Sequence, residues 1–281
     1  MSKITKVVIP VAGKGTRFLP ITKTISKTLL PIIDKPVIQY LLEEAISAGI
    51  TEALIIIGNN QSDVIDYFDL ESPYIESLNG VHYDEIENIK KLKEKINISY
   101  VVQPIAKGLG DAVSLAKEFA KGEDFALILG DDFVYSNQED IYGIGTLCNY
   151  YEQNQSYYLG VKEVPTIDTK KYGIVKPLNQ LAQKSNYFEI DGIIEKPNSN
   201  PPSNMACVGR YILKNNIFEY LSNTTYGVGN EIQLTDAIDL ALKDGNKIIA
   251  STFGGIRYDV GNKQGFIDAI IAIANSLNLI K

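Results

Sequence analysis

Histidine and cysteine are almost absent from this sequence. Its 281 residues include one histidine, His82, and two cysteines, Cys148 and Cys207. Neither a CxxC nor an HExxH pattern occurs, which argues against zinc chemistry and against nucleophilic catalysis that depends on histidine. The two cysteines match no metal or redox spacing, so we predict two buried free thiols in a reducing compartment. Any metal must be bound by oxygen ligands.

Long apolar segments and an excess of positive charge are also missing. No run approaches the roughly 18 apolar residues of a membrane span, and the start MSKITK lacks the apolar stretch of a signal peptide, so we expect a cytoplasmic protein with no membrane partner. The net charge of −7 argues against broad binding to nucleic acid. A phosphate-bearing partner should therefore be small and held by local cations.

A strand that ends in a basic glycine turn is predicted near the N-terminus, in VVIPVAGKGTRFLPITKTISKTLLP at residues 7–31. Glycines let backbone N–H groups approach an anion, and Arg17 and Lys27 would neutralise its charge. The P-loop pattern GxxxxGK[ST] fails because Val8 stands where it needs glycine, and the GxGxxG pattern fails at Phe18. We predict a phosphate-binding turn of a third kind; the alternative is a tight turn with solvated cations.

The periodicity of apolar residues predicts an α/β first half and a mixed, hairpin-rich second half. Residues 70–95 interrupt the first half as a charged helical insertion, in which we expect His82 to lie at the surface. The predicted helices are 37–49, 61–69, 111–121, 138–153, 214–222, 232–243 and 263–277. The predicted strands are 53–57, 98–103, 125–129, 157–164, 172–176, 188–197, 205–213 and 248–253.

Three of the predicted strands end in turns that carry glycine and charge. Ligands bind where the carboxyl ends of parallel strands meet, so the turns GKG, QPIAKG and GDD should converge on one crevice. Asp131 beside a phosphate-binding turn suggests Mg²⁺, and Asp259 is available as a second carboxylate. The alternative for Asp131 and Asp132 is a helix N-cap or a turn. Glu195 and Lys196 end another strand, although an EKP tripeptide alone is a common strand terminus.

Seven motifs occur in an order that resembles one enzyme family. They are IPVAGKGTRFLPITKTISKTLLPIIDKPVIQY, VVQPIAKGLGDAV, LGDD, YGIV, IIEKP, GVGNEIQLTDAI and YDVGNKQGF. Together they resemble the bacterial-type UTP:glucose-1-phosphate uridylyltransferases over nearly the whole chain. AKGLG and NEIQLTDAI are specific to that branch, whereas GTR and SKTLLP are shared with the glucose-1-phosphate thymidylyltransferases.

The resemblance implies a fold, a reaction and an assembly. The fold is α/β, with a Rossmann-like, mixed but mostly parallel central sheet flanked by helices. One domain would span residues 1–281, with a nucleotide-binding half at 1–135 and a half at 136–281 that binds sugar phosphate and forms the oligomer. The enzyme would use Mg²⁺ to join UTP to glucose 1-phosphate by in-line attack on the α-phosphorus, as a homodimer or homotetramer.

The resemblance also implies roles for individual residues. Ala12, Gly13 and Gly15 would lie against the nucleotide, with Arg17 on its phosphates and Lys27 on the charge that develops at the reacting phosphorus. Gln103 would read the edge of the base and Gly108 would lie against it. Asp131 and Asp259 would hold Mg²⁺, while Gly173, Glu195 and Lys196 would form the sugar-phosphate site. Lys14 and Asp132 depart from the family pattern.

Three other functions remain open at this stage. The same chemistry with dTTP, or with both nucleotides, differs only by one methyl group on the base, which a pocket discriminates by about 1 to 3 kcal/mol. A non-catalytic sugar-nucleotide sensor could have lost its carboxylates and phosphate cations, yet these are present. A Rossmann dehydrogenase would need the third glycine that is missing at Phe18.

Overall fold

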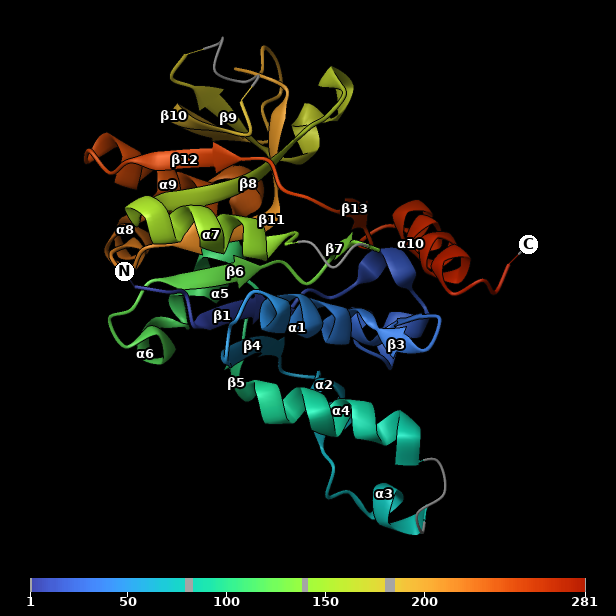
Figure 1. The fold of residues 1–281 in the computed structure, drawn as a ribbon. Coiled ribbons are helices and arrows are strands. Elements are labelled where there is room, and N and C mark those ends of the chain that lie inside the picture. The colour runs from blue at the N-terminus through green and yellow to red at the C-terminus, as the bar shows by residue number, and fades with distance from the viewer. Residues whose placement is uncertain (1, 79–82, 138–140, 180–184, 281) are drawn as a thin grey trace.

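The computed structural model describes residues 2–78, 83–137, 141–179 and 185–280, so His82 lies outside the described residues. Strands and helices alternate through the first half of the chain (Figure 1). The strands are β1 (Lys6–Pro10), β2 (Pro31–Ile32), β3 (Lys35–Pro36), β4 (Glu52–Gly58), β5 (Asn97–Gln103), β6 (Phe125–Ile128), β7 (Asp132–Tyr135), β8 (Tyr157–Glu163), β9 (Gly173–Pro177), β10 (Tyr187–Glu195), β11 (Met205–Leu213), β12 (Ile248–Ser251) and β13 (Ile256–Asp259). The α-helices are α1 (Val37–Ser47), α2 (Asp63–Phe68), α3 (Pro73–Ser77), α4 (Tyr83–Lys95), α5 (Leu109–Ser114), α6 (Lys117–Ala120), α7 (Ile144–Asn154), α8 (Ile217–Asn223), α9 (Leu234–Lys243) and α10 (Lys263–Ser276).

A nine-stranded mixed sheet runs through both halves of the chain. Its strand order is β5-β4-β1-β6-β11-β8-β12-β10-β9. The first four strands are mutually parallel, while β11 runs antiparallel to both β6 and β8. The predicted α/β class with a mixed central sheet is therefore correct. The parallel strands β5, β1 and β6 all end at the same edge, where the three glycine-bearing turns follow them.

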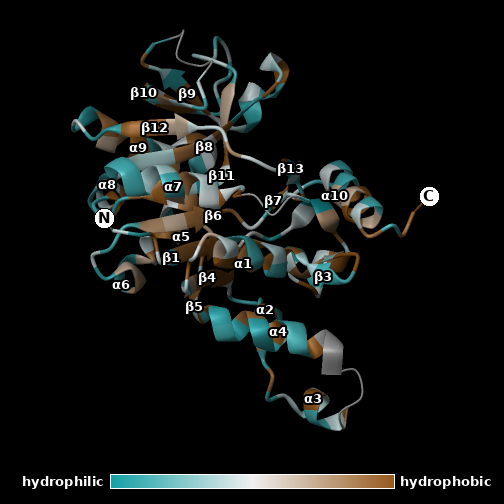
Figure 2. Cartoon of the chain, in the orientation of Figure 1, coloured by the Kyte–Doolittle hydropathy of each residue, from teal (hydrophilic) through white to brown (hydrophobic). Residues whose placement is uncertain are grey.

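Both faces of this sheet are covered by helices, because successive side chains of a strand point to opposite sides. In β1, Val7 and Ile9 join a buried cluster with helices α1 and α7, whereas Val8 joins a second cluster with α5, α8 and α9. The strands are hydrophobic and helix α4 presents a hydrophilic face (Figure 2). In the described part of the chain, every helix is too short or too polar to cross a bilayer.

One buried ion pair ties the helix layer to the sheet. Arg210 on β11 donates from Nε and Nη2 to the two carboxylate oxygens of Glu44 on α1, at 2.7 and 2.6 Å, and both side chains are buried. The backbone N–H of Ile144 also donates to Glu44, at 2.7 Å. This contact marks the start of α7 at Ile144. The helix predicted at 138–153 begins too early, since residues 141–143 are not helical, while residues 138–140 lie outside the described residues.

Other differences from the predicted elements have local or long-range causes. The helix predicted at 111–121 is split into α5 and α6, because Leu115 and Ala116 donate to carbonyls three residues back rather than four. The prediction of 232–243 began two residues early, since α9 starts at Leu234. Strands β7 and β13 were missed because four-residue segments more than a hundred residues apart pair only in the folded chain.

Candidate active site

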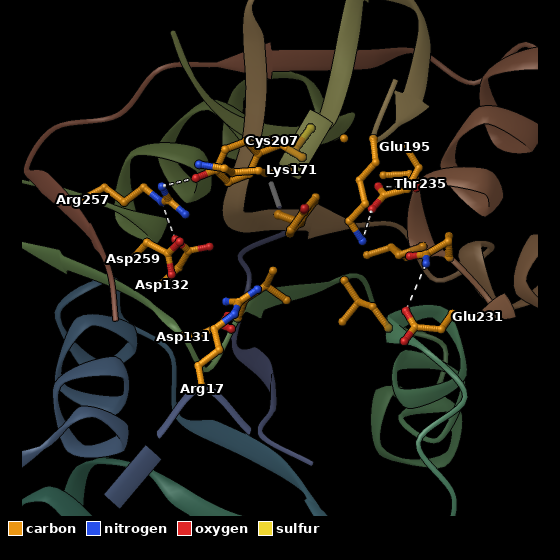
Figure 3. A pocket seen from close by; sticks show the side chains of 18 residues that line it. Arg17, Asp131, Asp132, Lys171, Glu195, Cys207, Glu231, Thr235, Arg257 and Asp259 are labelled. Atoms are coloured by element: carbon orange, nitrogen blue, oxygen red, sulfur yellow. Dashed lines mark hydrogen bonds and ion pairs between the residues drawn. The ribbon is translucent and has the colours of Figure 1, made fainter. Parts of the chain in front are cut away.

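Two adjoining cavities lie at the carboxyl edge of the parallel strands. One, of about 350 Å³, is lined by Ala12, Gly13, Gln103 and Gly108, among other residues. The other, of about 340 Å³, contains Arg17, Gly173, Glu195, Lys196 and Asp259 (Figure 3). The cavities share four lining residues, Leu109, Leu129, Asp131 and Glu231. The predicted convergence of the three strand ends on one crevice is therefore confirmed.

The glycine turn after β1 is held close to Lys27. Gly15 adopts a φ of +61°, and an added Cβ would lie 3.0 Å from Cβ of Lys27, so a larger residue would be strained here. Thr22 Oγ1 donates to the Gly15 carbonyl at 2.8 Å. The segment before Lys27 is anchored to α2, because the backbone N–H and hydroxyl of Ser26 both donate to Asp63 at 2.6 Å. No α-helix follows the strand directly; three short 3₁₀ turns do.

Lys27 and Asp131 contact each other. The Lys27 Nζ lies 2.9 Å from Asp131 Oδ2 and donates a hydrogen bond to it. Burial by itself raises the pKa of Asp131, but the Lys27 ammonium and the Arg257 guanidinium outweigh it, and the pKa of this carboxyl lies below its ordinary value. Asp131 is therefore an ionised acceptor at neutral pH. Arg17 reaches the same cavity and donates from Nη1 to the Gly261 carbonyl at 3.3 Å.

The two predicted metal carboxylates flank one small space. A Cβ added to Gly261 would lie 2.9 Å from Asp131 Oδ2 and 2.9 Å from Asp259 Oδ1. Because residue 261 is glycine, the space between these two anionic oxygens stays open. Oxygen ligands of this kind fit Mg²⁺, which keeps several waters and bridges substrate phosphates rather than filling an all-protein cage. Among the residues that the structure describes, no group of three or more His, Cys, Asp or Glu side chains suited to a metal occurs.

Asp132 contacts a different cation from the one that its neighbour Asp131 contacts. Its carboxylate forms an ion pair with Nε of Arg257, and the side chain is only 8% exposed. A Cβ on Gly209 would collide with it, at 2.4 Å from Oδ2. Arg257 in turn lies over the ring of Tyr172, with its guanidinium carbon 5.3 Å from the ring centroid. Asp132 thus neutralises and orients an arginine at the cavity wall.

The part of the cleft that carries Glu195 and Lys196 is built where β9 begins and β10 ends. Glu195 lies opposite Gly173 in the strand register and accepts a hydrogen bond from Thr235 Oγ1 at 3.0 Å. A Cβ on Gly173 would approach Thr235 to 2.7 Å, so glycine is required for this close contact. Lys196 follows with a φ of +46° and its Nζ lies 3.1 Å from Glu195. A carboxylate and an ammonium are therefore presented together to the cavity.

The wall of the cleft at Gly108 joins two motifs that are distant in the sequence. Gly108 has a φ of +114°, and an added Cβ would lie 2.5 Å from the Ile232 carbonyl. Two backbone hydrogen bonds connect the same segments, from Ile232 N–H to the Lys107 carbonyl at 2.7 Å and from Gly110 N–H to the Ile232 carbonyl at 2.8 Å. AKGLG and NEIQLTDAI therefore form one wall of the cavity.

The sequence identified most of the residues that the cleft brings together, but it missed several neighbours. Lys27 lines neither of the two cavities described above. It lines a small cavity of about 80 Å³ with Gly13 and Asp131, and a larger one of about 370 Å³ with Ala12, Gly13 and Gln103. Thr235 and Glu231 belong to the quoted NEIQLTDAI motif, which could have indicated them, whereas nothing in the local sequence marked Arg257. Cys207 lines the cavity as a thiol whose pKa is raised by burial, which disfavours the reactive thiolate. The prediction of two buried free thiols is confirmed.

Comparison with known proteins agrees with this arrangement. The nucleotidyl transferase family profile matches residues 6–276. The chain is 44% identical to a UTP–glucose-1-phosphate uridylyltransferase of Mycoplasma pneumoniae, over 96% of this chain and 92% of that protein. It is 41% identical to the protein of the same name in Bacillus subtilis, over 98% and 92% of the two chains. A solved UDP-glucose pyrophosphorylase in complex with UDP-glucose superposes with a TM-score of 0.87 at 40% identity, covering 97% of this chain and 99% of that one.

Proposed function

The chain belongs to the nucleotidyl transferase family, and from this membership we propose that it joins UTP to glucose 1-phosphate, forming UDP-glucose and pyrophosphate. The observation that carries the proposal is the pair of adjoining cavities that share Asp131. One cavity offers a nucleotide the Gln103 amide and glycine backbone within a mostly apolar wall, and the other presents a carboxylate and an ammonium suited to a sugar phosphate. The carboxylates and cations lie around their junction, where the reacting phosphorus would be.

The reaction requires no general base from the protein. The attacking oxygen of the sugar phosphate is ionised at neutral pH, and it forms a bond to the α-phosphorus while the bond from that phosphorus to pyrophosphate breaks. The protein must bring two polyanions together, offset their repulsion and align them for in-line displacement. Arg17 and Lys27 bind the triphosphate, and Lys196 binds the phosphate of the sugar. A mechanism without a general base is consistent with a chain that has a single histidine.

The other proposed roles are supported by the lining of the two cavities, which includes every residue named in this paragraph except Gly15. Glu195 accepts hydrogen bonds from sugar hydroxyls and is oriented for this by Thr235. Gly173 lies against the sugar phosphate. Ala12, Gly13 and Gly15 leave space for the nucleotide to approach the backbone, Gln103 reads the edge of the base, and Gly108 lies against it.

Asp131 and Asp259 would hold Mg²⁺. The open space between their oxygens and the hard-oxygen character of both ligands support this assignment. When bound, Mg²⁺ supplies charge neutralisation at the phosphates. Lys27 lies 2.9 Å from Asp131, so the same carboxylate can position the ammonium close to the phosphorus.

Release of pyrophosphate tests the proposed function. Purified protein is incubated with UTP, dTTP, CTP or ATP, each crossed with glucose 1-phosphate and other sugar 1-phosphates, with Mg²⁺ or with EDTA. We expect release with UTP and glucose 1-phosphate that EDTA abolishes. Activity with dTTP equal to that with UTP would assign a dual enzyme. Absence of release with every pair, from protein that unfolds cooperatively, would reject the proposal in favour of a binding protein.

We further propose that the protein is a homodimer or homotetramer. Helix α10 stands at the edge of the molecule (Figure 1), and its Ile267 and Ile271 are 48% and 46% exposed, next to Ile256 of β13 at 60%. Burying three such side chains would favour association. Light scattering of the native protein should give two or four chain masses, and Ile271→Glu should lower that mass. A monomeric native protein would reject the proposal.

A further inference from the structure

The side chain of Gln103 is held in one orientation by its neighbours. Gln103 is only 5% exposed, and its Nε2 donates to Asp111 Oδ2 at 2.7 Å and to the Gly108 carbonyl at 3.4 Å. An ionised carboxylate only accepts hydrogen bonds, so the amide nitrogen, not the oxygen, must face Asp111. Within the described part of the chain, no group donates a hydrogen bond to Gln103 Oε1. This oxygen can therefore accept a hydrogen bond from a ligand in the cavity of about 350 Å³ that Gln103 lines.

An oriented amide of this kind selects between pyrimidine bases. Uracil and thymine carry an N3–H donor between two carbonyls, whereas cytosine carries an N3 acceptor beside an exocyclic amine. We propose that Asp111 is a positioning residue that makes Gln103 present an acceptor, and that it thereby selects nucleotides with an N3–H over cytidine nucleotides. The inference rests on the proposed role of Gln103 at the base.

The surrounding structure keeps Asp111 in place for this task. Asp111 lies in the first turn of α5, directly after the Gly108 turn. That turn is fixed to Ile232 by the two backbone hydrogen bonds described above. The carboxylate therefore projects from a backbone that is held from both sides, and Gln103 at the end of β5 meets it across the turn. A charge-assisted hydrogen bond of 2.7 Å is the stronger of the two contacts to Nε2.

Asp111→Asn tests the proposal with the least change of shape. An asparagine can accept from the amide nitrogen of Gln103 or donate to its oxygen, so the two orientations of Gln103 become similar in energy. We expect the ratio of kcat/KM for UTP to that for CTP to fall about tenfold or more. The ratio for UTP to dTTP should not change, because both bases carry N3–H. A purely structural role at the helix N-terminus would lower the melting temperature but leave both ratios unchanged.

A matched control and a second variant complete the experiment. Glu118→Gln makes the same carboxylate-to-amide change at an exposed position in the first turn of α6 and should change neither ratio. If Asp111→Asn fails to fold, Asp111→Ser, which also both donates and accepts, replaces it. An unchanged UTP to CTP ratio in a folded variant would overturn the proposal.

Binding separates this inference from the proposed reaction. Calorimetry of native protein with UTP and with CTP should show tighter binding of UTP. A protein that releases no pyrophosphate yet prefers UTP to CTP, and loses this preference in Asp111→Asn, would refute the enzymatic function and support the inference. A native protein that binds both nucleotides equally would overturn the inference, whatever its activity.

Discussion

Replacement of Lys27 by alanine should remove most of the turnover while leaving the fold intact. Two effects of different size follow from the structure. The ion pair with Asp131 joins side chains that are 18% and 41% exposed, so its loss should destabilise the fold by only about 1 kcal/mol. For a chain of this length, that lowers the melting temperature by about 2 to 4 °C. Loss of the cation at the reacting phosphorus should lower kcat by about 100- to 1000-fold.

The assay is pyrophosphate release at saturating UTP and glucose 1-phosphate, measured together with thermal unfolding. Lys35→Ala is a matched control, because Lys35 also forms an ion pair at 2.9 Å, with Glu43, and these side chains are 31% and 36% exposed. We expect Lys35→Ala to lower the melting temperature by a similar amount and to leave the turnover unchanged. Near-normal turnover of Lys27→Ala would refute the assignment of Lys27 to the reacting phosphate.

The same ion pair predicts a pH dependence of stability. Because the pKa of Asp131 in the folded protein lies below its ordinary value of 3.8, the ionised carboxyl stabilises the fold above that value. This contribution should be lost as the pH falls through the lowered pKa of the folded protein. Urea unfolding of the native protein and of Asp131→Asn should therefore differ at pH 7 and converge on acidification. A difference that stays constant to pH 3 would contradict the ionised pair.

Three further substitutions test other parts of the structure. Gly261→Ala places a methyl group between the two proposed metal carboxylates and should raise the Mg²⁺ concentration for half-maximal turnover about tenfold or more; an unchanged Mg²⁺ titration would count against that site. Gly108→Ala forces a Cβ against the Ile232 carbonyl and should destabilise the fold by about 2 to 3 kcal/mol, seen as a lower urea midpoint. Arg210→Met leaves the Glu44 carboxylate buried without its cation and should destabilise the fold by about 3 to 5 kcal/mol. A melting temperature within about 2 °C of the native value, the shift expected for only about 1 kcal/mol or less, would disprove this prediction.

Elements with strong local patterns were predictable and elements that depend on partners were not. The continuous apolar run at residues 53–57 predicts a buried strand, and β4 indeed lies between β1 and β5. The start of α7 was misplaced because a contact with Glu44, far away in the sequence, accompanies its first turn. For β7 and β13 no local pattern exists, since each needs the other to complete its hydrogen bonds.

The sequence by itself determined the class of fold and the kinds of residue at the site. Apolar periodicity, the glycine turns and the charged strand ends are local properties, and the order of the motifs was sufficient to indicate the family. Only the tertiary structure decided which charges meet. Asp131 contacts Lys27, whereas its neighbour Asp132 contacts Arg257. The sequence cannot show which aspartate contacts which cation, because the two residues are adjacent and identical. The Asp111 contact that orients Gln103 likewise depends on how the turn between them folds back, because the direction of a hydrogen bond is a property of positions in space.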